Sequence, residues 1–129
     1  MVQSPSALII DDEAHVRLFL RTLLEAAGAG DIREAANGAD GAMIYAQEPT
    51  DIVLLDLNMP GQTGLDTLSQ ITGTDPDATV IIVTSQHDRE TVMECQRRGA
   101  AGFLLKSRPK DELLEALQEF FDDGEKTGG

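Results

Sequence analysis

The sequence predicts an α/β fold in which five parallel strands, each followed by a helix, form one doubly wound sheet. Three observations lead to this fold class: short aliphatic runs recur along the chain, segments with helical spacing separate them, and glycine or proline marks the junctions. Strands that alternate with helices imply right-handed crossovers and helices on both faces of the sheet. A length of 129 residues suits one domain with a single core.

The first two strand–helix units are recognised by their hydrophobic pattern. Residues 7–10 form an aliphatic run that is too short for a helix, and residues 32–36 form a weaker one. Gly28 and Gly30 stand where the first helix should end. The first helix carries a stripe at intervals of three and four, which we expect to face the core, and the second carries a weaker one. These stripes are Val16, Phe19, Leu20, Leu23 and Leu24, then Ala39, Ala42, Met43 and Ala46.

The remaining three units follow the same pattern. The aliphatic runs 52–55, 80–83 and 103–105 lack polar alternation, as expected for strands covered by helices on both faces. Pro60 and Gly61 interrupt the chain after the third strand, and Gly99 and Gly102 bracket the turn into the fifth. The apolar helical positions here are Leu65 and Leu68, Val92 and Cys95, and Leu113, Leu114, Leu117 and Phe121. We expect Cys95 to be buried packing rather than a nucleophile.

We expect the domain to comprise residues 1–121. Residues 122–129 are acidic and rich in glycine, with nothing to bury, and are predicted to form a loose tail. The sequence contains neither an internal repeat nor a low-complexity segment.

The composition excludes several classes of function. Ten basic against twenty-three acidic side chains give a formal charge of -13, which opposes direct binding to nucleic acid or to anionic lipid. Cys95, His15 and His87 lack zinc-ligand spacing, and a single cysteine fits a reducing compartment. No apolar run approaches the ~20 residues of a membrane span, and residues 1–6 do not resemble a signal peptide. We expect a cytoplasmic protein.

Reactive side chains stand where the predicted strands end. The first strand leads into Asp11 and Asp12, the third into Asp56, the fourth into Thr84 and the fifth into Lys106. Any one of them could be an ordinary polar residue at the surface, but ligands of open α/β sheets bind beyond these strand ends. If the first and third strands are neighbours, the three carboxylates repel one another by about 4 kcal/mol per pair at ~4 Å and an effective dielectric near 20. Such a site needs a cation.

The donor set favours a particular ion and a particular reaction. Carboxylate oxygens without nearby histidine or cysteine favour a hard ion, and few protein ligands with room for water favour Mg²⁺ over Ca²⁺. Together with Mg²⁺, the Lys106 charge and the Thr84 hydroxyl suit an incoming phosphoryl group. A carboxylate can then act as the nucleophile and form an acyl phosphate.

These residues, in this order, resemble the receiver domains of two-component response regulators. The resemblance rests on Asp11-Asp12, on VLLDLNMPG at 53–61, on IIVTS at 81–85 and on FLLK at 103–106, and it extends over residues 7–121. It implies a flavodoxin-like fold with strand order 2-1-3-4-5. In this sequence Ser107 follows Lys106 where many members of the family have proline, and Ser85 replaces the commoner alanine.

The resemblance also implies roles for the site residues. Asp56 would accept the phosphoryl group. Asp12 and Asp56 would ligate Mg²⁺ together with the backbone carbonyl of Asn58, and Asp11 would hold the water shell of the metal. Lys106 would receive the new charge.

For the switch, the resemblance implies that Thr84 moves to bond the phosphoryl oxygens. Phe103 would turn inward behind it, and the face made by the fourth helix, fifth strand and fifth helix would change shape. The alternative for Phe103 is an ordinary core aromatic residue.

The expected function is that of a signalling switch rather than an enzyme, because the chain would catalyse only its own phosphoryl transfer and autodephosphorylation. The expected phosphodonor is a sensor histidine kinase or a histidine phosphotransfer protein, and the output is docking to a protein target. We expect the chain to act alone, since no segment is left for an effector domain; the alternative is a receiver fragment of a larger response regulator.

Three other functions compete with this interpretation. An aspartyl-phosphate hydrolase of the haloacid dehalogenase type needs an acid two residues after its nucleophile, where Asn58 stands. A flavodoxin-like electron carrier needs a phosphate loop after the first strand, where Asp11, Asp12 and Glu13 would repel flavin phosphate. A docking module that no longer accepts phosphate would not need Asp56, Asp12, Thr84 and Lys106, all of which are present.

Overall fold

The predicted fold class and strand order are both confirmed. The structure, a computed structural model, describes residues 4–59, 63–85 and 88–127. Its five strands form one parallel sheet in the order β2-β1-β3-β4-β5. The strands are β1 (Ala7–Ile10), β2 (Ile32–Ala35), β3 (Ile52–Asp56), β4 (Val80–Thr84) and β5 (Gly102–Leu105). The helices are α1 (Ala14–Ala27), α2 (Gly38–Gln47), α3 (Gly64–Thr74), α4 (Arg89–Arg97) and α5 (Lys110–Thr127).

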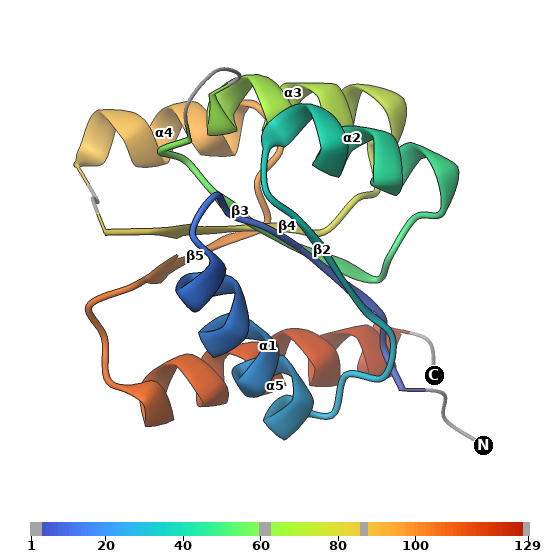
Figure 1. Cartoon of the computed structure of the whole chain (residues 1–129), viewed down its shortest axis with the longest axis vertical. Coiled ribbons are helices and arrows are strands. Elements are labelled where there is room, and N and C mark those ends of the chain that lie inside the picture. Colours follow the sequence, from blue (N-terminus) through green and yellow to red (C-terminus); the bar gives the residue numbers. More distant parts are fainter. Residues whose placement is uncertain (1–3, 60–62, 86–87, 128–129) are drawn as a thin grey trace.

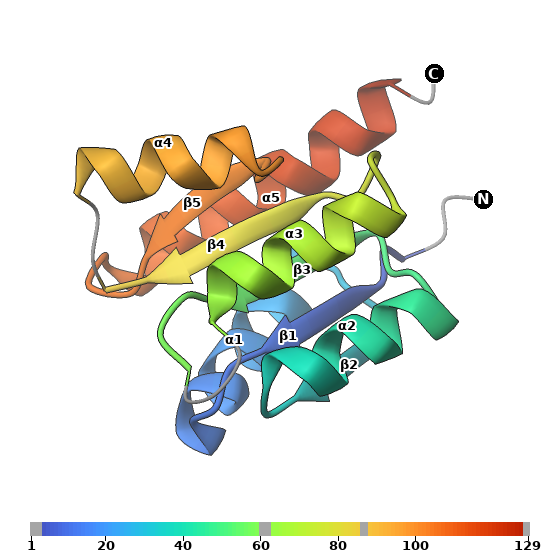
Figure 2. The same ribbon diagram turned by 90° about the horizontal axis from the view of Figure 1, so that it is seen from above.

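Helices cover both faces of the sheet. Figure 1 shows α2, α3 and α4 on one face and α1 and α5 on the other, and Figure 2 shows the strands running between these layers. Successive strand residues therefore enter two separate cores. Leu54 packs on the side of α1 and α5, whereas Val53 and Leu55 pack on the side of α2, α3 and α4. This arrangement explains why the central strands lack polar alternation.

The helix ends follow the local signals in the sequence. Gly28 ends α1 in a left-handed conformation with φ 107°, which glycine adopts without steric cost. Asn37, Thr63 and Asp88 begin α2, α3 and α4, and each side chain accepts a hydrogen bond from a backbone N–H three residues later. Cys95 is fully buried in α4, as predicted.

Two expectations differ from the structure. The α1 stripe is only partly buried, because Leu20, Leu23 and Leu24 reach the core whereas Phe19 is 38% exposed. Phe19 instead borders a cavity of about 170 Å³ that Lys106 also lines. The last helix continues to Thr127, beyond the predicted boundary at Phe121. The single Gly124 costs a helix only about 1 kcal/mol, so it does not have to end there. Whether residues 122–129 are loose stays a prediction.

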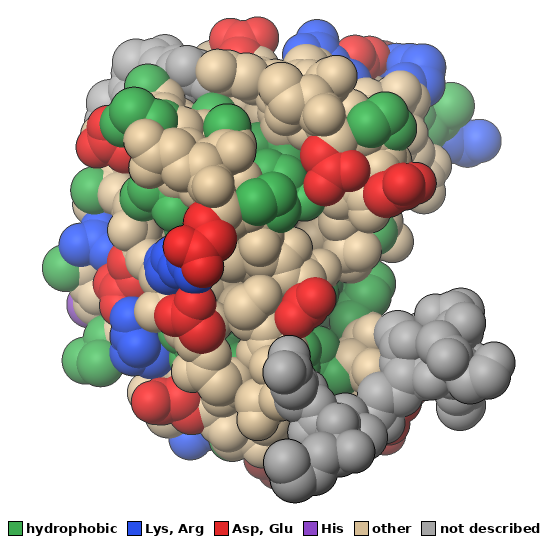
Figure 3. Space-filling view, turned by 90° about the vertical axis from the view of Figure 1, so that its right-hand side faces the viewer, with side chains coloured by type: hydrophobic (Ala, Val, Ile, Leu, Met, Phe, Trp, Pro, Cys, Tyr) green, Lys and Arg blue, Asp and Glu red, His purple; other side chains and the backbone are tan. Residues whose placement is uncertain are grey.

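Acidic side chains are spread over the face of the molecule that Figure 3 shows. Figure 3 shows acidic side chains interspersed with basic and apolar ones on the side of the molecule that lies at the right of Figure 1. The excess negative charge is therefore not confined to one site. Within residues 4–59, 63–85 and 88–127, no helix combines the length and apolar character that crossing a bilayer requires.

Candidate acidic site at the carboxyl edge of the sheet

The parallel sheet brings the predicted site residues to one edge. Ile10 pairs with Leu55, so Asp11 and Asp56 follow neighbouring positions of β1 and β3. Thr84 is the last residue of β4 and pairs with Leu105, which directly precedes Lys106. The backbone N–H of Lys106 also donates to the Thr84 carbonyl oxygen at 2.9 Å. Strands 1, 3, 4 and 5 of the chain thus converge on one site.

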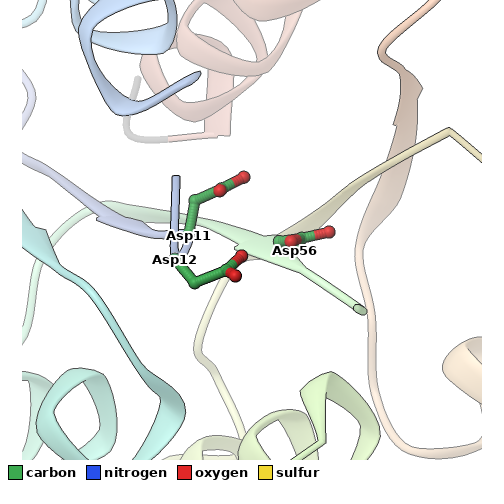
Figure 4. Close-up of side chains that lie close together, drawn as sticks. All are labelled: Asp11, Asp12 and Asp56. Carbon is green, nitrogen blue, oxygen red and sulfur yellow. The ribbon is translucent and has the colours of Figure 1, made fainter. Parts of the chain in front are cut away.

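Three carboxylates form the centre of this site. Figure 4 shows Asp11, Asp12 and Asp56 projecting from the ends of β1 and β3 toward a common region. One oxygen from each of them lies within 4.8 Å of the others. Asp11 and Asp56 are almost completely buried, with 0% and 3% of each residue exposed, whereas Asp12 is more accessible to solvent. The predicted crowding of negative charge is therefore present.

Lys106 supplies the positive charge of the site. Its Nζ lies 3.2 Å from Asp11 Oδ2 and 3.4 Å from Asp56 Oδ1, and its side chain is 24% exposed. Burial opposes the charge of the ammonium group, but the attraction of Asp56 and Asp11 outweighs it and raises the pKa of Lys106. The lysine is therefore a fixed cation beside two buried carboxylates.

Asp56 is held in place by its own loop. The backbone N–H of Asn58 donates to Asp56 Oδ1 at 3.2 Å, and the Asn58 side chain is exposed. Burial raises the pKa of the Asp56 carboxyl group, although Lys106 and the Asn58 hydrogen bond act in the opposite direction.

Asp11 carries an unsatisfied oxygen. Its Oδ1 accepts a hydrogen bond from the Glu13 backbone N–H at 2.9 Å. Its Oδ2 is buried and accepts no hydrogen bond within the described part of the chain, although Lys106 Nζ lies 3.2 Å away. The single contact with the ammonium group leaves part of the hydrogen-bonding capacity of this buried oxygen unused, which is costly unless a further ion or an ordered water meets it. The donor set therefore fits a hard divalent cation with its water shell.

Thr84 and Phe103 lie on β4 and β5, the two strands that follow β3 in the sheet. Thr84 is fully buried at the end of β4. Phe103 is half-buried in β5 and packs against the core on the side of α4, so the interpretation as a core aromatic residue remains open. It also borders a cavity of about 340 Å³ together with Val92, Arg108 and Glu112.

Some residues that the sequence drew attention to do not join the centre of the site. His15 is highly exposed, and its Nε2 lies 3.1 Å from Glu13 Oε2. His87 lies outside the described residues, as do Pro60 and Gly61.

A sequence comparison identifies the family. Residues 7–118 match the family described as "Response regulator receiver domain". The chain belongs to this family. Receiver domains are signalling switches rather than classical enzymes.

Individual relatives agree with this assignment. This receiver domain is 33% identical to the chemotaxis protein CheY of Listeria monocytogenes over 112 residues, and the alignment covers 87% of this chain and 94% of that protein. It is 34% identical to the nitrate/nitrite response regulator protein NarL of Escherichia coli over 119 residues, and that alignment covers 91% of this chain but only 55% of NarL. The family therefore includes both CheY-like chains of similar length and longer regulators.

Solved structures resemble this receiver domain as a whole. A crystal structure of the CheX–CheY–BeF3–Mg²⁺ complex from Borrelia burgdorferi matches it with a TM-score of 0.84 and 29% identity, covering 90% of this chain and 88% of that one. A CheY-like receiver domain from Methanospirillum hungatei matches with a TM-score of 0.87 and 25% identity, covering 97% and 99% of the two chains.

Two residues that support the site of this receiver domain were not found by sequence reasoning. Arg17 Nη1 donates to the Asp11 carbonyl oxygen at 2.8 Å, and no sequence motif pointed to that contact. A Cβ at Gly64 would lie 2.5 Å from the Asp56 carbonyl oxygen, so glycine is required by close packing. Gly64 directly precedes Leu65, the first apolar position of the expected third helix, but nothing in the sequence pointed to its contact with Asp56.

Proposed function

We propose that this receiver domain accepts a phosphoryl group on Asp56 in a Mg²⁺-dependent reaction and then changes conformation to control partner binding. The observation that carries the proposal is the position of Asp56. Its buried carboxylate lies at a strand end, shares a pocket with two more carboxylates and is 3.4 Å from the Lys106 ammonium group. The phosphodonor would be a sensor histidine kinase or a histidine phosphotransfer protein.

The metal site would use oxygen ligands. Asp12 and Asp56 would hold Mg²⁺ together with the Asn58 backbone carbonyl, while the unsatisfied Oδ2 of Asp11 would accept from the water shell of the ion. When bound, Mg²⁺ would offset the negative charge that phosphoryl oxygens bring to this acidic pocket. The Borrelia burgdorferi complex, which contains CheY, BeF3 and Mg²⁺, supports this assignment by analogy.

The covalent step would occur on Asp56. One carboxylate oxygen attacks the phosphorus of a phosphohistidine, the P–N bond breaks, and the imidazole leaves with the electron pair of that bond. An aspartyl phosphate results. Lys106, already close to both Asp11 and Asp56, would interact with the new phosphoryl oxygens as a point charge.

The signal would pass from the new charge to β4 and β5. Thr84 would shift to bond a phosphoryl oxygen, and Phe103 would turn inward behind it. Ile82 and Phe103 are paired across these two strands, so a movement at the end of β4 reaches β5 directly. The covalent charge would shift an existing equilibrium between two conformations. The resulting change at α4, β5 and α5 would be read by a protein target.

The acceptor is tested with acetyl phosphate and intact-protein mass spectrometry. With Mg²⁺, the wild-type chain should gain one phosphoryl group, and Asp56→Ala should gain none. Asp77→Asn is the control, because Asp77 lies exposed between α3 and β4, at the opposite edge of the sheet. Modification that persists in Asp56→Ala, or an unmodified wild-type chain, would contradict the proposal. Chelation of Mg²⁺ should abolish the mass gain without unfolding the protein.

A further inference from the structure

The loop between β1 and α1 carries two of the three carboxylates, and its backbone is held from two directions. The Asp11 N–H donates to the Ala35 carbonyl of β2 at 3.1 Å. The Asp11 carbonyl oxygen accepts from Arg17 Nη1 at 2.8 Å. That carbonyl belongs to the peptide group that joins Asp11 to Asp12. A hydrogen bond to this carbonyl therefore restricts the orientation of the peptide group, and with it the directions of the Asp11 and Asp12 side chains.

The guanidinium group of Arg17 is itself anchored. Its Nε donates to Glu34 Oε1 at 3.1 Å, and the side chain is only 19% exposed. The other oxygen of Glu34 accepts from Arg21 Nε at 2.6 Å. Hydrogen bonding to Arg21 is the main reason why the pKa of Glu34 is lowered, so this carboxylate stays ionised. The Arg17 guanidinium group thus connects Glu34 of β2 to the backbone of the loop between β1 and α1.

The contact that Arg17 makes with the loop leaves the carboxylates available. In the described part of the chain, its hydrogen-bond partners are the Asp11 carbonyl and the Glu34 side chain, not a side chain of the acidic site. A rigid, planar guanidinium can hold two acceptors at fixed angles, which an ammonium group on a flexible stem does less well. The loop is therefore fixed without a competing ion pair at the metal ligands.

We infer that Arg17 is a positioning residue for the metal site: it fixes the Asp11–Asp12 peptide against Glu34 of β2 so that both carboxylates are oriented for a divalent cation. The inference rests on the proposed function, because it concerns the Mg²⁺ that the site is proposed to bind. Groups that orient metal ligands from outside commonly change metal affinity by about 10- to 100-fold when they are removed.

The test compares the Mg²⁺ affinities of Arg17→Gln and Arg21→Gln. Each variant is titrated with MgCl2 alone, and binding is monitored by the NMR shifts of the backbone amides. Arg21 is a matched control, because it also binds Glu34 and donates to a backbone carbonyl, that of Ile32, but does not touch the metal loop. Arg17→Gln should weaken Mg²⁺ binding by about 10-fold or more. Arg21→Gln should retain the wild-type affinity. The Asp12 amide nitrogen should also shift in metal-free Arg17→Gln and not in Arg21→Gln.

Two further variants separate positioning from general stability. Arg17→Lys keeps the charge but loses the fork, so its Mg²⁺ affinity should lie between those of wild type and Arg17→Gln. Glu34→Gln keeps Arg17 but weakens the hydrogen bond that holds its guanidinium group, so it should also lower the affinity for Mg²⁺. This variant tests the inference if Arg17→Gln does not fold. Wild-type affinity in all Arg17 and Glu34 variants, or an equal loss in Arg21→Gln, would overturn the inference. Absence of Mg²⁺ binding by the wild-type chain would instead overturn the proposed metal site.

Discussion

At the residue scale, burial and a neighbouring cation act on the same group, the carboxylate of Asp56. Burial, helped by the negative charge of Asp11, raises the pKa of Asp56, and Lys106 and the Asn58 N–H only partly offset this. The proposed phosphoryl acceptor is therefore a residue whose negative charge the folded state opposes. Exclusion of bulk water would strengthen the electrostatic effect of Lys106, and of Mg²⁺ when bound, on the phosphoryl group that Asp56 is proposed to accept.

This balance predicts a pH-dependent effect of Asp56→Asn on stability. A carboxyl group whose pKa is raised on folding binds protons more readily in the folded state, so its ionisation lowers stability above the unfolded-state pKa of about 3.9. Asp56→Asn should therefore increase the free energy of unfolding at pH 7, and the increase should vanish as the pH falls below that value. Urea unfolding in EDTA across this range measures the difference. The exposed control Asp77→Asn should show no comparable increase, and a destabilised Asp56→Asn at pH 7 would refute the argument.

At the element scale, the start of α3 supports the loop that follows β3. The Gly64 N–H donates to the Leu57 carbonyl oxygen at 3.1 Å, and an added Cβ would come within 2.5 Å of the Asp56 carbonyl oxygen. Backbone cannot move aside as a flexible side chain can. The helix and the end of β3 are therefore in direct contact just below the proposed phosphoryl acceptor.

This contact predicts that Gly64→Ala lowers stability by about 1–3 kcal/mol, as overpacking commonly does. It should also slow phosphorylation by acetyl phosphate, because the Asp56 backbone must shift. Gly73→Ala is the matched control in the same helix, since a Cβ there has nothing within 4 Å. That variant should be neutral or stabilised by up to about 1 kcal/mol, the difference in helix propensity. Equal behaviour of the two variants in urea unfolding would contradict the packing argument.

At the scale of the whole molecule, Mg²⁺ binding at the proposed site should raise the free energy of unfolding. A ligand that binds only the folded state stabilises it by about 2.7 kcal/mol at 100 times its dissociation constant. Mg²⁺ should therefore raise the unfolding midpoint of the wild-type chain, and Asp12→Asn should remove most of that increase. Because the chain carries a charge of -13, NaCl of equal ionic strength is the necessary control. A midpoint that responds equally to NaCl and MgCl2 would argue against a specific site.

Much of the fold and of the central site was predictable from sequence because the signals are local. Aliphatic runs and helical stripes mark the elements, and polar residues directly after the runs at Asp11, Asp56 and Lys106 must meet at one edge once the strands are parallel. The strand order was predicted only from the family resemblance, and the structure confirms it.

Other features depend on which segments pack together, and no local pattern encodes them. Phe19 belongs to an apolar stripe, yet the neighbours of α1 leave it partly exposed. The contact between Gly64 and the Asp56 carbonyl, and the bridge from Glu34 through Arg17 to Asp11, join residues from different elements. The side chains that come together at this edge of the sheet could thus be predicted from the chain, whereas their roles stay a proposal. The groups that hold them in position are defined only by tertiary packing, because their partners are distant in sequence and include backbone atoms common to every residue.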